Sequence, residues 1–198
     1  AVPIHTVILS DHGLGGGVLL PNARKGVFQA LRQEGWRIKG KLTQPGDVVL
    51  TPFGLVSSFE AYTRAGDEKG VAEAIVTAPG VELCAYRSGD DSWVVVREDS
   101  RASFRRRQGA DGPEWTYRPQ AGDPLHLAEV VDRLRDGAPD GGTNGAPDGD
   151  WFTEPDWFEA SWNTSYPDPL FRIAGGFERV QNPASVLCSV SNGYLYGA

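Results

Sequence analysis

The chain of 198 residues contains no methionine, only two cysteines and only three histidines. Because position 1 is alanine instead of an initiator methionine, we expect the chain to be a segment of a longer protein. Cys84 and Cys188 both lie in apolar stretches, which favours buried small side chains, although a disulfide between them stays open. Neither cysteine has the basic neighbour that activates a nucleophilic thiol.

Long apolar runs and an excess of positive charge are also missing. No run approaches the roughly 20 residues of a membrane-spanning helix, so no membrane segment is expected. The net charge is -7, which argues against binding to nucleic-acid polymers, because phosphate contacts need a positive surface. A phosphate substrate that meets a metal ion is not excluded. With 40% hydrophobic and 23% charged residues, the composition is that of one folded domain.

The most informative stretch is an apolar run at residues 5–10 that ends in Asp11, His12 and Gly13. The β-branched run predicts a buried strand, and the glycines at 15–17 predict a hinge loop after it instead of a phosphate-binding loop. In open α/β sheets, ligands bind at the carboxyl ends of strands. A carboxylate oxygen and an imidazole nitrogen suit zinc or manganese, so we predict that Asp11 and His12 are metal ligands.

Residues 7–13, Val-Ile-Leu-Ser-Asp-His-Gly, resemble the second metal-ligand motif of the alkaline phosphatase superfamily. The nearest branch is that of the type I phosphodiesterases and nucleotide pyrophosphatases. The similarity extends weakly to four later stretches, residues 47–54, 122–125, 166–168 and 182–185. The resemblance implies two zinc ions in the complete protein around a Ser or Thr nucleophile, with Asp11 and His12 on one ion. The nucleophile and the other ligands have no counterpart here, which implies a central to C-terminal fragment.

By this resemblance, we expect a metal-dependent hydrolase of small phosphate esters, such as phosphodiesters or nucleotides. The catalytic residues stay unassigned, and we expect the chain by itself to be inactive. The alternative is a noncatalytic binding module. In that alternative Asp11 caps the loop, His12 makes a structural hydrogen bond, and the aromatic segment 151–162 binds a partner or a glycan.

The fold that we predict is α/β, a mostly parallel sheet with flanking helices like an incomplete alkaline phosphatase. Residues 1–198 would form one domain, with a small antiparallel α+β insert at about 66–110 and a flexible loop at 137–150. Apolar periodicity, caps and breakers predict helices at 22–34, after Asp67, from Asp123 to Gly137, and after Thr153. Strands are predicted at 36–41, 47–50, 81–86, 93–97, 102–107 and 185–190.

Three side-chain predictions accompany these elements. In helix 22–34 the buried face should hold Val27, Phe28 and Leu31. The arginines at 101 and 105–107 should mark a solvated edge strand instead of an anion site, with Arg106 on the opposite face from its neighbours. His126 should be a surface residue, and most aromatic side chains of 151–162 should pack on the protein.

Overall fold

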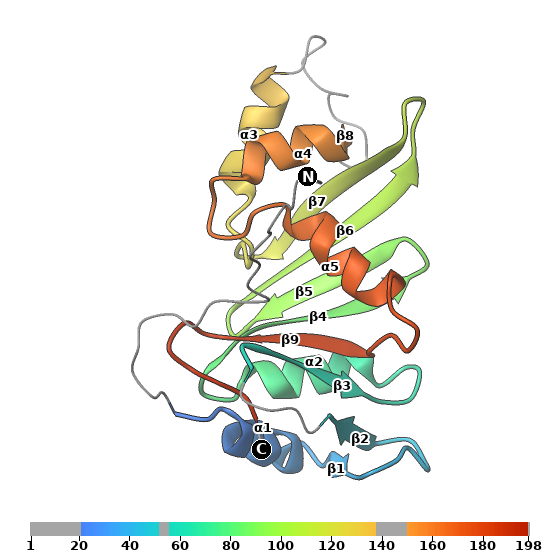
Figure 1. Cartoon of the computed structure of the whole chain (residues 1–198), viewed down its shortest axis with the longest axis vertical. Coiled ribbons are helices and arrows are strands. Elements are labelled where there is room, and N and C mark those ends of the chain that lie inside the picture. The colour runs from blue at the N-terminus through green and yellow to red at the C-terminus, as the bar shows by residue number, and fades with distance from the viewer. Residues whose placement is uncertain (1–20, 52–55, 138–149, 198) are drawn as a thin grey trace, which may run out of the picture.

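The computed structural model describes residues 21–51, 56–137 and 150–197 (Figure 1). The predicted strand at 5–10 and most of the predicted loop at 137–150 lie outside these residues. In chain order, the elements are α1 (Arg24–Gln33), β1 (Arg37–Ile38), β2 (Asp47–Leu50), β3 (Ser58–Tyr62), α2 (Glu68–Val76), β4 (Val81–Gly89), β5 (Ser92–Arg97), β6 (Ser100–Gln108), β7 (Pro113–Ala121), α3 (Ala128–Gly137), β8 (Phe152–Thr153), α4 (Glu154–Ser161), α5 (Pro169–Glu178) and β9 (Val186–Val190).

All the described strands belong to one sheet in the order β1-β2-β3-β9-β4-β5-β6-β7-β8. The α/β class is therefore confirmed, but the prediction of a mostly parallel sheet is wrong. Among the described pairs only β1 and β2 run parallel. The physical reason is the length of the connections. Two residues join β4 to β5 and two join β5 to β6, whereas a parallel pair needs a crossover of a dozen or more.

Strands β4–β6, which we expected in an insert at about 66–110, lie in this same sheet. Their strand assignments are confirmed, and so are those of β2 and β9. Sequence reasoning missed β3, β7, β8 and α5. Whether residues 66–110 form an insert on a larger body stays a prediction, because the strand that would define that body is not among the described residues.

Helices cover both faces of the sheet, and the alternation of side chains along each strand sorts the core into two clusters. On β4, Cys84 and Tyr86 face the cluster that includes α1 and α2, while Leu83 and Ala85 face the cluster of α3, α4 and α5. Strand β5 follows the same rule, as successive side chains of a strand point to opposite faces. We call the two sides the α1/α2 side and the α3–α5 side.

Helix α1 confirms the helix predicted at 22–34 but corrects its buried face. Val27, Ala30 and Leu31 are buried in the α1/α2 side. Phe28 is only partly buried and lies between the guanidinium groups of Arg24 and Arg32, at 4.9 and 5.8 Å from the ring centroid. The core-facing stripe therefore shares Val27 and Leu31 with the expected one, and Ala30 takes the place of Phe28.

The starts of three later helices show how well the cap predictions hold. Thr153 caps α4 through a capping box with Asp156, as predicted. Asp67 stands at the N-cap of α2, but its carboxylate accepts a hydrogen bond from Gly46 N at 2.8 Å instead. Helix α3 begins at Ala128 and not at Asp123, because the backbone of His126 is left-handed, with φ 54°.

Candidate functional site

The two predicted metal ligands, Asp11 and His12, lie outside the described residues, so the structure gives no geometry for them. Within the ranges that are described, no group of three or more histidine, cysteine, aspartate or glutamate side chains is arranged to hold a metal ion. A complete catalytic zinc site, which normally has three protein ligands and an open position, is therefore not found within those ranges alone.

A polar cleft that sequence reasoning missed joins four separate segments. Arg97 on β5 approaches His126 Nε2 at 2.9 Å and Glu82 on β4 at 3.6 Å. Tyr166 donates its hydroxyl hydrogen to Glu82 at 2.5 Å and stacks on His126, with ring centroids 6.2 Å apart. The cleft has a volume of about 610 Å³, and Asp123 lines it as well. His126 is exposed, as predicted, but it is held by specific contacts.

Burial and hydrogen bonds shift the pKa values of two groups at this cleft, Tyr166 and Asp123. Burial, and then the hydrogen bond to Glu82, raise the pKa of Tyr166 to about 12, so its hydroxyl stays protonated at neutral pH. Burial acts to raise the pKa of Asp123, but hydrogen bonds from Tyr117 and from backbone amides outweigh it and lower the pKa. Because an arginine can only donate, His126 Nε2 accepts from Arg97. The network ties four segments together, and none of these groups is left as an activated nucleophile.

The aromatic segment 151–162 divides into a buried and an exposed part. Phe152 and Trp157 are buried and meet edge to face, and Trp157 Nε1 donates to Trp115 O at 3.1 Å. By contrast, Phe158 is 56% exposed and Trp162 is 61% exposed. These two residues are four positions apart on α4 and its C-cap, so they share one helical face. We call this pair the aromatic face.

A groove of about 970 Å³ borders the aromatic face between α3 and α4. Trp162 lines it together with Glu129, Arg133, Asp156 and Glu159. Arg133 donates to Ala160 O at 2.8 Å, and Asp156 is engaged in the capping box. Glu129 and Glu159 form no hydrogen bond or ion pair with another described residue. An exposed indole and two carboxylates that have no partner among the described residues thus lie around one depression.

The arginines of β6 correct the prediction of an edge strand, since β6 lies between β5 and β7 in the sheet. Arg106 donates to both carboxylate oxygens of Glu178, at 2.7 and 2.8 Å, and also pairs with Asp91. Its guanidinium lies 5.5 Å from each of two tryptophan rings, those of Trp93 and Trp115. As expected from strand alternation, Arg105 and Arg107 lie on the other face, over Trp151. Arg106 and Arg107 therefore pair with neighbouring acids.

Comparison of the chain with protein-family models, with curated proteins and with solved structures gives no significant match. In the described ranges, no helix has both the length and the apolar character that crossing a bilayer requires.

Proposed function

We propose that the chain is part of a metal-dependent hydrolase of phosphate esters, with phosphodiesters or nucleotides as substrates. The observation that supports this proposal is the motif at residues 7–13, where Asp11 and His12 directly follow an apolar strand-like run. The helix that the proposal requires after the glycine loop is α1, whose apolar stripe packs into the core. Strand, loop and helix in this order are typical of a ligand-binding edge.

The donor types of Asp11 and His12 fit zinc, but their number does not complete a catalytic site. When bound, zinc ions would neutralise phosphoryl oxygens and lower the pKa of an attacking hydroxyl or water. In the proposal Asp11 and His12 hold one of two ions and orient it toward the substrate. We assign no residue of the chain as nucleophile, because the position that carries it in the resembling family has no counterpart here.

A zinc titration followed by calorimetry tests this assignment. We expect weak binding by the 198-residue chain, abolished in both Asp11→Ala and His12→Ala and unchanged in the matched control His126→Ala. Turnover of a p-nitrophenyl phosphodiester should be absent, since the covalent step lacks its nucleophile. Zinc binding that survives both substitutions would remove the motif from the proposal, and real turnover by this chain would show that the site is complete.

A second candidate function, a binding module, is favoured by the aromatic face. Large apolar side chains that stay exposed together often mark binding surfaces, and tryptophan faces stack on sugars and on partner side chains. The observation in favour is the exposure of Phe158 and Trp162 beside a groove with free carboxylates. In this function Asp11 and His12 would be structural, and α4 would bind a glycan or a protein partner.

Titration of the chain with soluble oligosaccharides, followed by tryptophan fluorescence, tests the binding module. Saturable quenching that is lost in Trp162→Ala would support it. The matched control is Val180→Ala, because Val180 is also a large exposed apolar residue, at 45%, but lies outside the groove. Equal quenching in the wild type and in Trp162→Ala would count against a glycan-binding role for this face.

A further inference from the structure

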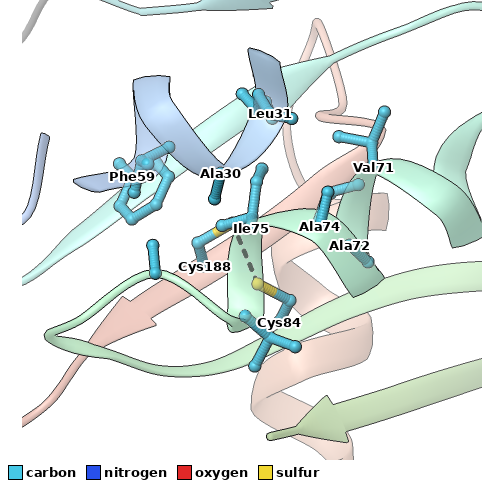
Figure 2. Packing of buried hydrophobic residues seen from close by; sticks show 14 of the residues in the cluster. Ala30, Leu31, Phe59, Val71, Ala72, Ala74, Ile75, Cys84 and Cys188 are labelled. Carbon is cyan, nitrogen blue, oxygen red and sulfur yellow. Dashed lines mark hydrogen bonds between the residues drawn. The ribbon is translucent and has the colours of Figure 1, made fainter. Parts of the chain in front are cut away.

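The two cysteines of the chain lie directly opposite each other on neighbouring strands. Strands β4 and β9 pair antiparallel, with Cys84 opposite Cys188 and Ala85 opposite Leu187. The two Sγ atoms are 3.5 Å apart and form a hydrogen bond (Figure 2). Both thiols are free and buried, with residue exposures of 0% and 3%. Residues 104 positions apart in sequence are therefore brought within one sulfur contact.

The type of strand pair decides whether these thiols can be joined. Val190 N donates to Ser57 O, so the main-chain groups of Val190 point away from β4 and toward the β3 side. The main-chain N–H and C=O groups of successive residues in a strand point to opposite sides, so those of Cys188, two residues before Val190, also point toward β3. Cys84 and Cys188 are therefore a non-hydrogen-bonded pair between β4 and β9. In such a pair, Cα atoms are about 4.5 Å apart and the side chains are closest. This spacing is at the short end of the range that disulfides span.

The surroundings of the two thiols favour a disulfide between Cys84 and Cys188 over any other reaction of either thiol. The two thiols lie in the α1/α2 side of the core among apolar residues, with Ile75 of α2 next to them in Figure 2. Since the chain has only two cysteines, no alternative intramolecular disulfide exists. Burial, and next the neighbouring Cys84, raise the pKa of the Cys188 thiol, so we expect slow reaction in the folded protein and faster reaction during folding.

We propose that Cys84 and Cys188 are a redox-active dithiol that closes to a cross-strand disulfide when the protein meets a disulfide oxidant such as oxidised glutathione. One cysteine thiolate attacks a sulfur of oxidised glutathione and releases one glutathione thiolate. The other thiolate then attacks the resulting mixed disulfide and releases the second. Two protein thiols are oxidised, one molecule of oxidised glutathione is reduced to two of glutathione, and the two thiol protons pass through solvent to the released glutathione thiolates.

The disulfide would covalently link β9 to β4, two neighbouring strands in the middle of the sheet. The S–S distance must fall from 3.5 Å to about 2.05 Å, which side-chain rotation can supply while the strand register is kept. The crosslink would restrict the unfolded chain over a long loop, so the oxidised protein should resist urea more than the reduced one. The account is independent of the proposed hydrolase function.

The test is to refold the 198-residue chain from urea in buffers of oxidised or reduced glutathione and to count free thiols by alkylation and intact mass. We expect the oxidised sample to be monomeric, to lack two hydrogens in mass, to have no alkylatable thiol, and to unfold at a higher urea concentration. Cys84→Ala and Cys188→Ala should each show no such shift of the urea midpoint with glutathione.

Two results would overturn the proposal. The first is a natively refolded protein that keeps both thiols free in oxidised glutathione. The second is an oxidised protein that unfolds at a lower urea concentration than the reduced form, because the disulfide would then be incompatible with the native sheet. Both results come from the wild-type chain, so the test does not depend on the folding of either variant.

Discussion

The two sides of the sheet differ in the chemistry of their cores. The α1/α2 side is built mainly from valine and alanine, and it contains the buried dithiol. The α3–α5 side is dominated by large aromatic residues, namely Trp93, Phe104, Trp115, Tyr117, Phe152, Trp157 and Phe177. Tyrosine and tryptophan carry polar atoms, and on this side Tyr117 donates to Asp123 and Trp157 donates to Trp115 O. In the described residues, the polar cleft and the aromatic face both adjoin that second side.

The comparison teaches that the two cores differ in how far their aromatic side chains extend to the surface. On the α1/α2 side, small aliphatic side chains bring α2 close to β4. On the α3–α5 side, Trp157 is buried and bonded while its neighbour Phe158 is exposed. The predictions below compare the two sides by substitution, in order of decreasing effect.

The largest loss of stability is expected for Trp93→Ala on the α3–α5 side. Trp93 is fully buried and stacks on Phe104 with ring centroids 5.1 Å apart. Removing such a side chain leaves a large cavity, which costs about 3–5 kcal/mol in the free energy of unfolding. Urea denaturation measures it. The matched control is Trp162→Ala, which should change the free energy of unfolding by less than about 0.5 kcal/mol, because Trp162 is exposed.

On the α1/α2 side, Leu31→Ala should cost about 2–5 kcal/mol, since Leu31 is fully buried. Phe28→Ala on the same helix should cost clearly less, because Phe28 is partly exposed between two arginines. Urea melts of the two variants give the comparison. Equal losses would mean that the buried stripe of α1 is misassigned.

An intermediate effect is expected for Arg106→Ala, at about 1–2 kcal/mol. The variant loses two charge-assisted hydrogen bonds to Glu178 and contacts with two tryptophan rings. Arg135→Ala provides the control, because Arg135 is half exposed and ion pairs at such sites contribute little. If thermal melts show the same small shift for both arginines, the Arg106 network has no special role.

The last prediction concerns the pH dependence of stability that arises from the buried carboxylate of Asp47. Hydrogen bonds from the Thr43 side chain and backbone, with further bonds from Gln44 and Arg37, hold its pKa far below the ordinary 3.8. A lowered folded-state pKa stabilises the protein above the unfolded pKa, and this stability is lost as the pH falls toward the folded value. Urea melts from pH 5 downward should therefore show falling stability, with a flatter profile in Asp47→Asn.

Local sequence patterns predicted most of the elements but not their partners. The spacing of apolar residues located α1, α2 and β4–β6 because these signals act within a few residues. Strand β9 inserts between β3 and β4, far away in sequence, and no local pattern encodes that pairing. The expected parallel sheet was inferred from a single strand, loop and helix, and the short hairpins overrule it.

Two of the missed elements, α5 and β7, contain residues that have a low propensity for the structure they form. Helix α5 includes Gly175 and Gly176, which lower helix propensity. A side chain at Gly176 would meet Leu187 Cδ1 at 2.7 Å, so this glycine permits close approach of helix and sheet. Strand β7 contains Pro113 and Pro119, which argue against a strand when only the sequence is considered.

The candidate sites likewise divide into one that local sequence predicts and others that depend on contacts between distant segments. The Asp11 and His12 pair is visible in sequence because both residues are adjacent and follow an apolar run. The cleft of Glu82, Arg97 and His126 joins distant segments and has no local pattern. On α4, both stripes contain aromatic residues, Trp157 on one and Phe158 on the other. Periodicity therefore identified the helix but could not decide which stripe is buried.

The most direct test of the proposed metal site is a long-range ¹H–¹⁵N NMR spectrum of the histidine side chains during zinc addition. The chain has only three histidines, His5, His12 and His126, so each ring can be assigned. We predict that zinc shifts one ring nitrogen of His12, leaves His126 unchanged, and has no effect on His12 in Asp11→Ala. A His12 ring that does not respond to zinc, or a response confined to His5 or His126, would contradict the assignment of Asp11 and His12 as metal ligands.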